Sequence, residues 1–217
     1  MMNNKLLKTA AKVAFLGAAF GLAGCASAYI PDTVHNHYKA PASLTKVPGA
    51  ENVTVTVDVQ NHKKRHDEIS RSKDMLGIPF AGIYLHIDKA FRKAMDAALE
   101  KRGFNIGSHG ANVQVVVQHF YMPMDMSTAA VSFNGRLVMQ VSIPSADYSQ
   151  SVTIDKQKLE SSSSWGQLAT LSPGRSYAAN AFVSAAINQV VNNPEFIAAL
   201  LKAGHAGVVV PRLSAAE

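Results

Sequence analysis

The chain of 217 residues has one cysteine, Cys25, and one tryptophan, Trp165. A single cysteine excludes an internal disulfide, so the fold must depend on its own hydrophobic core. Charged residues make up 17% of the chain and hydrophobic residues 47%, which excludes a highly charged, disordered protein. The apolar run at residues 13–24 would rise about 18 Å as a helix, too little to cross a bilayer core of about 30 Å.

The positive charge of the chain is concentrated at its start. The formal net charge is +6, but Lys5, Lys8 and Lys12 lie in the first twelve residues, which contain no acid. Residues 25–217 therefore carry 18 basic and 15 acidic side chains, a formal +3. A balance this mild does not indicate a nucleic-acid partner.

A basic segment followed by a short apolar run is typical of an export signal. The run ends in Leu22, Ala23, Gly24 and Cys25, an order that resembles the lipobox of bacterial lipoproteins. The thiolate is the strong nucleophile that such a site needs, so we expect Cys25 to carry covalent lipid such as palmitate, and no other cofactor. The three residues before it would be recognised by the signal peptidase. By the same resemblance, Ala26 implies sorting to the outer membrane, with the domain facing the periplasm.

We expect four parts along the chain: a signal peptide at residues 1–24, a lipidated cysteine with a flexible tether at 25–50, a globular domain at 51–203, and a loose tail at 204–217. The tether is predicted because its sequence is polar, has no apolar periodicity and contains three prolines. Fully extended, 25 residues would reach roughly 75 Å and hold the domain clear of the membrane.

Hydrophobic periodicity predicts the elements of the domain. Alternating residues indicate strands at 53–59, 113–121, 129–143 and 150–160, and helical spacing indicates helices at 82–102 and 175–192, with a short third helix from Pro194 to Gly204. Residues 60–79 are expected to form a loop. Asn134-Gly135 is either a hairpin turn or, more simply, a kink or bulge in one strand. The order β-α-β-β-β-α predicts a two-layer α+β domain, with helices on one face of a mostly antiparallel four-stranded sheet.

This arrangement resembles the YajG family of proteobacterial lipoproteins, from the lipobox to about residue 201. The resemblance is carried by the lipobox, by the strands at 53–59 and 113–121, by the helix end at residues 99–104, and by the closing helix with Asn180, Ile187 and Val191. It implies an envelope lipoprotein and gives no catalytic residues to transfer.

His119, Met122, Met124 and Met126 form a candidate metal site. Thioethers are soft ligands that suit Cu(I), and alternate methionines after a strand can converge on one ion. The alternative is that these methionines fill gaps in the core.

Other short motifs favour ordinary structure. Ser70 and Lys73 fit a Ser-x-x-Lys motif, but the companion motifs of penicillin-recognising enzymes are missing. The pairs His35/His37 and His62/His66 have no cysteine or acidic partners at the spacing of a closed zinc site. The basic run at 62–66 is either a solvated face or a contact for anionic headgroups or lipopolysaccharide phosphates. Trp165 is either core or a partner-binding residue.

The function predicted from the sequence is a non-enzymatic module, anchored in the outer membrane, that binds another envelope component, expected to be a protein. Its binding surface would be a sheet edge or the loops around 60–80 and 161–172. A periplasmic copper-handling protein using the methionine segment is the second hypothesis, and a small envelope hydrolase is the third.

Overall fold

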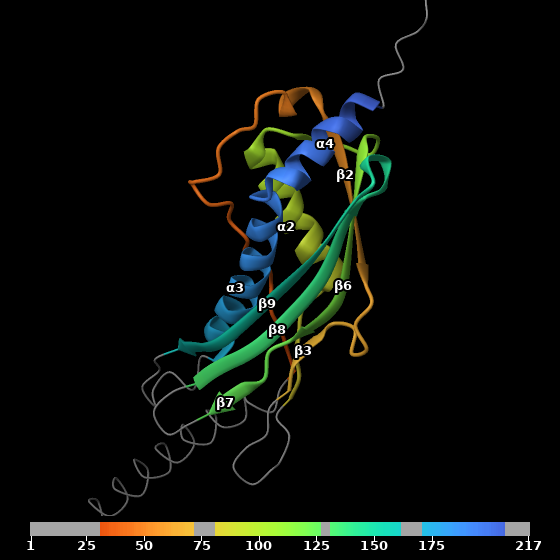
Figure 1. The fold of residues 1–217 in the computed structure, drawn as a ribbon. Coiled ribbons are helices and arrows are strands. Elements are labelled where there is room, and N and C mark those ends of the chain that lie inside the picture. Colours follow the sequence, from red (N-terminus) through yellow and green to blue (C-terminus); the bar gives the residue numbers. More distant parts are fainter. Residues whose placement is uncertain (1–30, 72–80, 127–130, 162–170, 207–217) are drawn as a thin grey trace, which may run out of the picture.

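The computed structural model describes residues 31–71, 81–126, 131–161 and 171–206. Within these ranges, a long sheet carries three helices on one of its faces, which makes the predicted two-layer α+β arrangement (Figure 1). The helices are α2 (Ile87–Arg102), α3 (Leu171–Val191) and α4 (Pro194–Ala206). None of the helices described is long and apolar enough to cross a membrane.

The four predicted long strands are present and lie side by side in the order β2, β6, β8 and β9. Their bounds are Thr54–Asn61, Ala111–Tyr121, Val131–Ile143 and Tyr148–Ser161. Short strands β5 (Asn105–Ile106) and β7 (Met124–Met126) pair with β2 and β8 and complete a six-stranded sheet in the described chain. Buried and less buried residues alternate along β2 as its sequence predicts.

The predicted four-stranded, mostly antiparallel sheet needs correction. β2 and β6 are parallel, with Val55 opposite Ala111 and Asn61 opposite Val117, whereas β6–β8 and β8–β9 are antiparallel. The physical reason is that α2 lies between β2 and β6 in the sequence and returns the chain to the same end of the sheet. The sheet is therefore mixed.

A second sheet joins one short strand each from the predicted tether, the predicted loop at 60–79 and the start of the predicted first helix. Strands β1 (Asp32–Thr33), β4 (Ile83–Tyr84) and β3 (Glu68–Ser70) form it in that order. β4 also corrects the start of the first helix, which begins at Ile87 and not at residue 82. The Asp67 carboxylate accepts a hydrogen bond from the Ile87 backbone N–H at 3.3 Å, which fixes that start.

Residues 31–50 also differ from the predicted flexible tether, because they pack on the domain. Val34 and Leu44 are 2% and 4% exposed. The Asn36 side chain donates to the Ala90 carbonyl on α2 at 2.6 Å, and the Tyr38 hydroxyl lies 2.8 Å from the Asn188 side-chain oxygen on α3. Single anchoring residues in irregular backbone leave no periodic signal in the sequence.

Two local predictions concern glycines. β8 continues through Asn134-Gly135, with a register shift between Phe133 and Gly135, so the bulge is confirmed and the hairpin is wrong. A Cβ at Gly135 would lie 2.7 Å from both Met122 Cβ and Phe182 Cζ, which explains the small residue. Gly204 does not end α4, which continues to Ala206.

The core is filled by side chains from both layers. The Phe120 ring on β6 lies 6.4 Å from the Phe91 ring on α2 and 5.6 Å from the Phe182 ring on α3, and all three are essentially fully buried. Rings from α2, β6 and α3 thus fix the helices on the sheet. The same packing fixes the end of β6, where the candidate site lies.

Candidate functional site

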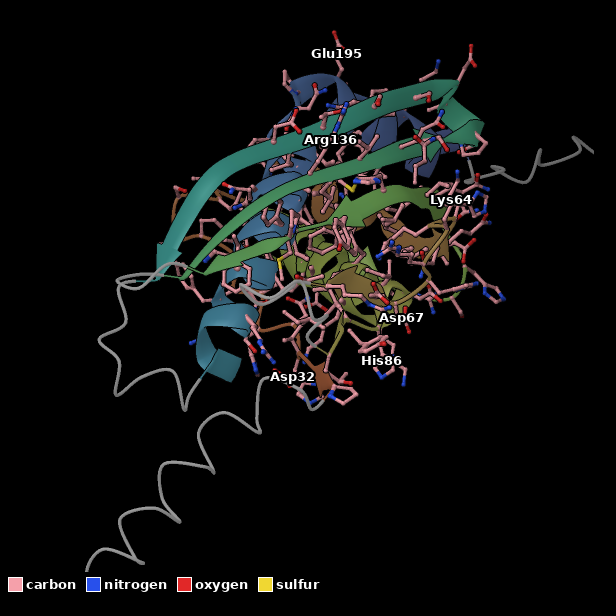
Figure 2. The ribbon with its side chains drawn as sticks, turned by 90° about the horizontal axis from the view of Figure 1, so that it is seen from below. Asp32, Lys64, Asp67, His86, Arg136 and Glu195 are labelled. Carbon is pink, nitrogen blue, oxygen red and sulfur yellow. The ribbon has the colours of Figure 1, made fainter. Side chains whose placement is uncertain are left out.

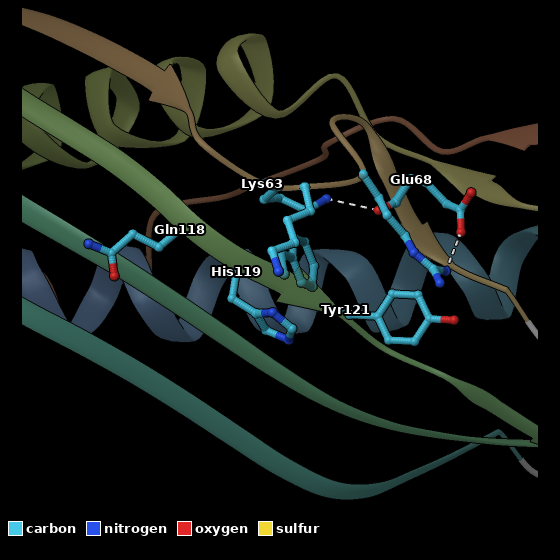
Figure 3. Close-up of a pocket in the computed structure, with 8 residues that line it drawn as sticks. Lys63, Glu68, Gln118, His119 and Tyr121 are labelled. Carbon is cyan, nitrogen blue, oxygen red and sulfur yellow. Dashed lines mark hydrogen bonds and ion pairs between the residues drawn. The ribbon is translucent and has the colours of Figure 1, made fainter.

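A cavity of about 350 Å³ lies where the turn after β2 meets the last residues of β6 (Figure 3). We call residues 62–67 the basic turn. The cavity is lined by Lys63, Lys64, Arg65, Glu68, Gln118, His119, Phe120 and Tyr121. It therefore combines a cationic wall from one strand end with a polar and aromatic wall from the neighbouring strand.

Lys63 is buried in this wall, with 7% of the residue exposed. Its Nζ donates to the backbone carbonyls of His66, at 2.7 Å, and of Glu68, at 2.9 Å, and lies 5.9 Å from the Phe120 ring centroid. Burial lowers the pKa of Lys63 to about 8, against the opposing effect of the Asp67 and Glu68 charges. Lys63 thus acts as an internal clamp that closes the basic turn.

Glu68 holds two arginines at the edge of the cavity. Its two carboxylate oxygens lie 2.9 Å from Arg65 Nη1 and 2.7 Å from Arg71 Nη2. Glu68 is buried, whereas the arginine side chains are 57% and 48% exposed. Arg65 also lies over the Tyr121 ring at 5.3 Å, and the Tyr121 hydroxyl donates to the Arg71 carbonyl at 2.9 Å. The guanidinium groups are therefore positioned before any ligand arrives.

The opposite wall is shaped by a bulge in β6. The register with β8 shifts between Val117 and His119, and Gln118 and His119 are both exposed. The pKa of His119 is lowered, first by burial and then by the positive charges of Arg136 and Lys63. A neutral imidazole at this position can donate or accept a hydrogen bond.

The arrangement is suited to binding an anion more than to proton transfer. Lys63 and Glu68 are occupied by partners within the protein, and the exposed charged groups at the rim, Lys64 and Arg65, are cations. Residues 62–71 contain four basic and two acidic side chains, which leaves a formal +2. Preorganised guanidinium and ammonium donors recognise phosphate and carboxylate groups.

A second, larger hollow of about 550 Å³ lies beside β2 and α2 and has a different character. Arg92 there lies 3.6 Å from the Asp58 carboxylate, and the remaining lining residues are Thr56, Val57, Ser108, His109, Gly110 and Asn112. Its one arginine faces an acid, so this hollow has no comparable excess of positive charge.

The structure does not bring His119 and Met122 together. Met122, just past the end of β6, is fully buried in the core, whereas His119 on β6 is exposed. Met124 and Met126 belong to β7, but their side chains lie outside the described part of the structure. Across the residues described, no cluster of three or more histidine, cysteine or acidic side chains is placed to hold a metal.

The other candidate residues are distributed as follows. His35, His37, His62 and His66 are exposed. Ser70 is fully buried, and Lys73 lies outside the described residues. Leu22, Ala23, Gly24, Cys25 and Trp165 also lie outside them.

Sequence reasoning identified only part of this site. The basic run at 62–66 is conspicuous by its charge, but that charge pattern does not extend to Glu68, Arg71 and Tyr121. A signal was present in the spacing, because Arg65, Glu68 and Arg71 are each three residues apart. The contribution of β6 follows from tertiary contact and leaves no local pattern.

Fold and site together define a two-layer α+β domain with a cationic surface pocket. Residues 40–201 match the family model Lipoprotein_16, whose description is "Uncharacterized lipoprotein". The chain belongs to this family of lipoproteins, which confirms the predicted relationship to YajG-type bacterial lipoproteins.

Two solved structures show a distant likeness to this chain. A DUF330-family protein from Xanthomonas campestris is 12% identical, with a TM-score of 0.42, over 82% of this chain and 98% of its own. A Helicobacter pylori protein, described as a candidate homolog of the neuraminyllactose-binding hemagglutinin, is 10% identical, with a TM-score of 0.40, over 80% of this chain and 99% of its own. No curated protein matches the chain significantly. At these TM-scores we draw no functional conclusion from either structure.

Proposed function

We propose that this chain is a non-enzymatic lipoprotein of the bacterial envelope, anchored through acylated Cys25 in the outer membrane and facing the periplasm. Its domain binds an anionic envelope component in the cationic pocket. The observation that carries the binding role is the fixed pair of half-exposed arginines on one buried carboxylate, Glu68. Family membership among lipoproteins and the lipobox-like residues 22–25 support the anchor.

The contacts of the two buried charged residues of the pocket, Lys63 and Glu68, support binding over catalysis. A general base needs a lone pair that is available to a substrate proton. The Glu68 carboxylate is instead taken by Arg65 and Arg71, and Lys63 already donates to two carbonyls. These contacts hold the donors in place, and ordered donors lose less conformational entropy when an anion binds.

Lipid anchoring gives such a module its biological effect. A domain held at a leaflet meets ligands of that membrane at high effective concentration, so a pocket of modest intrinsic affinity is sufficient. The ligand class that fits is a phosphate or carboxylate group presented by a lipid, a glycolipid or an acidic protein segment.

In-cell photo-crosslinking tests this function. A photoreactive residue replaces Lys64 at the pocket rim, and a matched variant carries it at Lys101, an exposed residue near the end of α2. We expect phosphate- or carboxylate-bearing products from position 64 that are absent at position 101, identified by mass spectrometry. Identical products from both positions, or none from position 64, would overturn the binding role of the pocket.

A further inference from the structure

The chain enters the domain at a fixed point, Asp32. Its backbone N–H donates to the Gly82 carbonyl at 3.2 Å, and the next strand contact runs from Val34 N–H to the Tyr84 carbonyl at 2.9 Å. The Asp32 carboxylate also lies 3.4 Å from Nη1 of Arg175, whose side chain is only 3% exposed. Asp32 is thus held by β4 and by α3.

This attachment shortens the distance between the domain and its anchor. Cys25 and Asp32 are seven residues apart in the sequence. Seven residues span at most about 25 Å when fully extended. With residues 31–50 packed on the domain, the membrane surface lies within that distance of Asp32, and not at the roughly 75 Å that a tether to residue 50 would allow.

The cationic pocket lies on the same side of the molecule as this attachment. Asp32 pairs with Ile83 in β1–β4, and Glu68 pairs with Tyr84 in β4–β3. Neighbouring strands are about 4.8 Å apart, so β3 is roughly 10 Å from β1. Figure 2 shows Asp32, His86, Asp67 and Lys64 following one another along this side.

Three exposed cationic side chains lie on the side of the molecule that carries the β1–β4–β3 sheet: Lys64, Arg65 and Arg71. We call them the basic surface. The charged groups that face them are Lys63, Asp67 and Glu68, and farther away the Arg136–Asp155 pair, which joins β8 and β9 at 3.5 Å. Positive charge is in excess in this neighbourhood, and the Tyr121 ring beneath Arg65 adds an amphipathic contact.

We infer that the basic surface docks on anionic phospholipid headgroups of the same leaflet that holds Cys25. This inference rests on the proposed lipid anchor, and it names the pocket's ligand as the phosphate of headgroups that carry a net negative charge, in contrast to zwitterionic phosphatidylcholine. Docking would hold the domain against the membrane in one orientation, with the β1–β4–β3 sheet and the basic turn next to the headgroups. Clustered basic side chains within a Debye length of an anionic surface are attracted to it.

Lysine labelling of the lipidated chain in vesicles tests the inference without altering the fold. Vesicles are made of neutral phosphatidylcholine alone or with about 30 mol% anionic phosphatidylglycerol. An impermeant amine reagent is applied, and mass spectrometry gives the modification rate of each lysine. Lys64 is the reporter, with Lys101 and Lys202 as internal controls.

The two controls lie far from the basic surface. Lys101 is near the end of α2, whose 16 residues extend about 24 Å from Ile87. Lys202 belongs to α4, next to Gly204, which approaches Val53 before the start of β2. The basic turn follows the opposite end of the eight-residue β2, about 27 Å away.

We expect anionic vesicles to slow labelling of Lys64 by about fivefold or more relative to neutral vesicles, the effect of about one basic side chain at such a surface. Lys101 and Lys202 should label equally in both, and about 1 M salt should abolish the difference, because the Debye length falls to about 3 Å. Equal labelling of Lys64 in both vesicles would overturn the inference. A chain that does not remain with either vesicle would instead contradict the anchor.

A third arm separates membrane phosphate from free phosphate. Inorganic phosphate is added to the lipidated chain in neutral vesicles at matched ionic strength. We expect no protection of Lys64 there, and protection equal to that in anionic vesicles would overturn headgroups as the ligand. In a non-acylated chain that begins at residue 25 and carries Cys25→Ser, the double variant Lys64→Gln/Arg65→Gln should lose about 25-fold in retention on anionic vesicles. The control variant Lys101→Gln/Lys202→Gln makes the same change of charge and should keep its retention on anionic vesicles.

Discussion

The buried Nζ of Lys63 donates to the backbone carbonyl of Glu68 at 2.9 Å, so the residue that clamps the basic turn also fixes the backbone of the residue that holds both arginines. The clamp and the anion-binding groups are therefore mechanically linked. Because the link passes through the backbone, it does not depend on the Glu68 side chain, and the two residues can be tested separately.

Removing the clamp should destabilise the domain. Lys63→Met deletes the donor to the His66 and Glu68 carbonyls and keeps much of the aliphatic packing. We expect the free energy of unfolding in urea at pH 7 to fall by about 1–3 kcal/mol. Lys101→Met, at an exposed position on α2, should change it by less than about 0.5 kcal/mol. Equal effects of the two substitutions would contradict the role of Lys63.

The same lysine predicts a pH dependence of stability. Its pKa is lowered from 10.5 to about 8 in the folded chain, so between these values the unfolded state binds more protons than the folded state. Stability contributed by this group therefore rises as pH increases from about 8 to about 10.5, by at most about 3 kcal/mol. The rise should be visible as the difference between wild type and Lys63→Met in urea titrations across this window. A pH-independent difference would show that Lys63 ionises normally.

Substituting Glu68 should change stability and binding in opposite directions. Glu68→Gln removes a buried charge that faces Arg65 and Arg71, and the half-exposed arginines limit the loss to about 1–2 kcal/mol. At the same time, the formal charge of residues 62–71 rises from +2 to +3, so retention on anionic vesicles should increase. Glu100→Gln on α2 makes the same change in net charge at an exposed position. It should change neither the free energy of unfolding nor the retention on anionic vesicles.

The packed segment at residues 31–50 is tested through one hydroxyl. Tyr38→Phe removes the contact with Asn188 and should lower the free energy of unfolding by about 1 kcal/mol. Tyr177→Phe is the matched control, because Tyr177 is 64% exposed. If both variants unfold at the same urea concentration as the wild type, the segment does not contribute to the domain through this contact.

The anchor itself is tested at Cys25. Cys25→Ser removes the thiol, so the chain should incorporate no radiolabelled palmitate, remain unprocessed by the lipoprotein peptidase, and lose its lipid-dependent association with membranes. The measurements are gel mobility, label incorporation and salt-washed membrane fractionation. Processing of the serine variant at the wild-type position would refute acylation at this residue.

The parts of this fold that could be predicted are those that repeat a pattern. Alternation along residues 53–59 located β2, and three- and four-residue spacing located most of α2, because one face of each element is buried. Ile83 fits the helical spacing, yet it lies in a strand, because tertiary contacts decide the boundary. Val34 and Leu44 anchor an irregular segment and show no period at all.

The site was less predictable for a related reason. Charge made the run at 62–66 conspicuous, but a linear sequence does not show that Lys63 points inward while Lys64 points outward. It also does not show that Tyr121 lies beneath Arg65, since these residues are distant in sequence and meet only when β2 and β6 pair. The methionine segment was conspicuous for its composition, and its first member, Met122, is fully buried in the core.

The parallel pairing of β2 has a consequence for how the chain folds. Thr54 pairs with Asn105 of β5, and Val55 pairs with Ala111 of β6. Both neighbours of β2 therefore come from more than fifty residues later in the sequence. Closing so large a loop slows nucleation, and contacts of this range characterise slow-folding domains. β2 therefore stays unpaired until residues 105–117 are available, so a chain made from its N-terminus cannot begin this sheet before that later segment has followed.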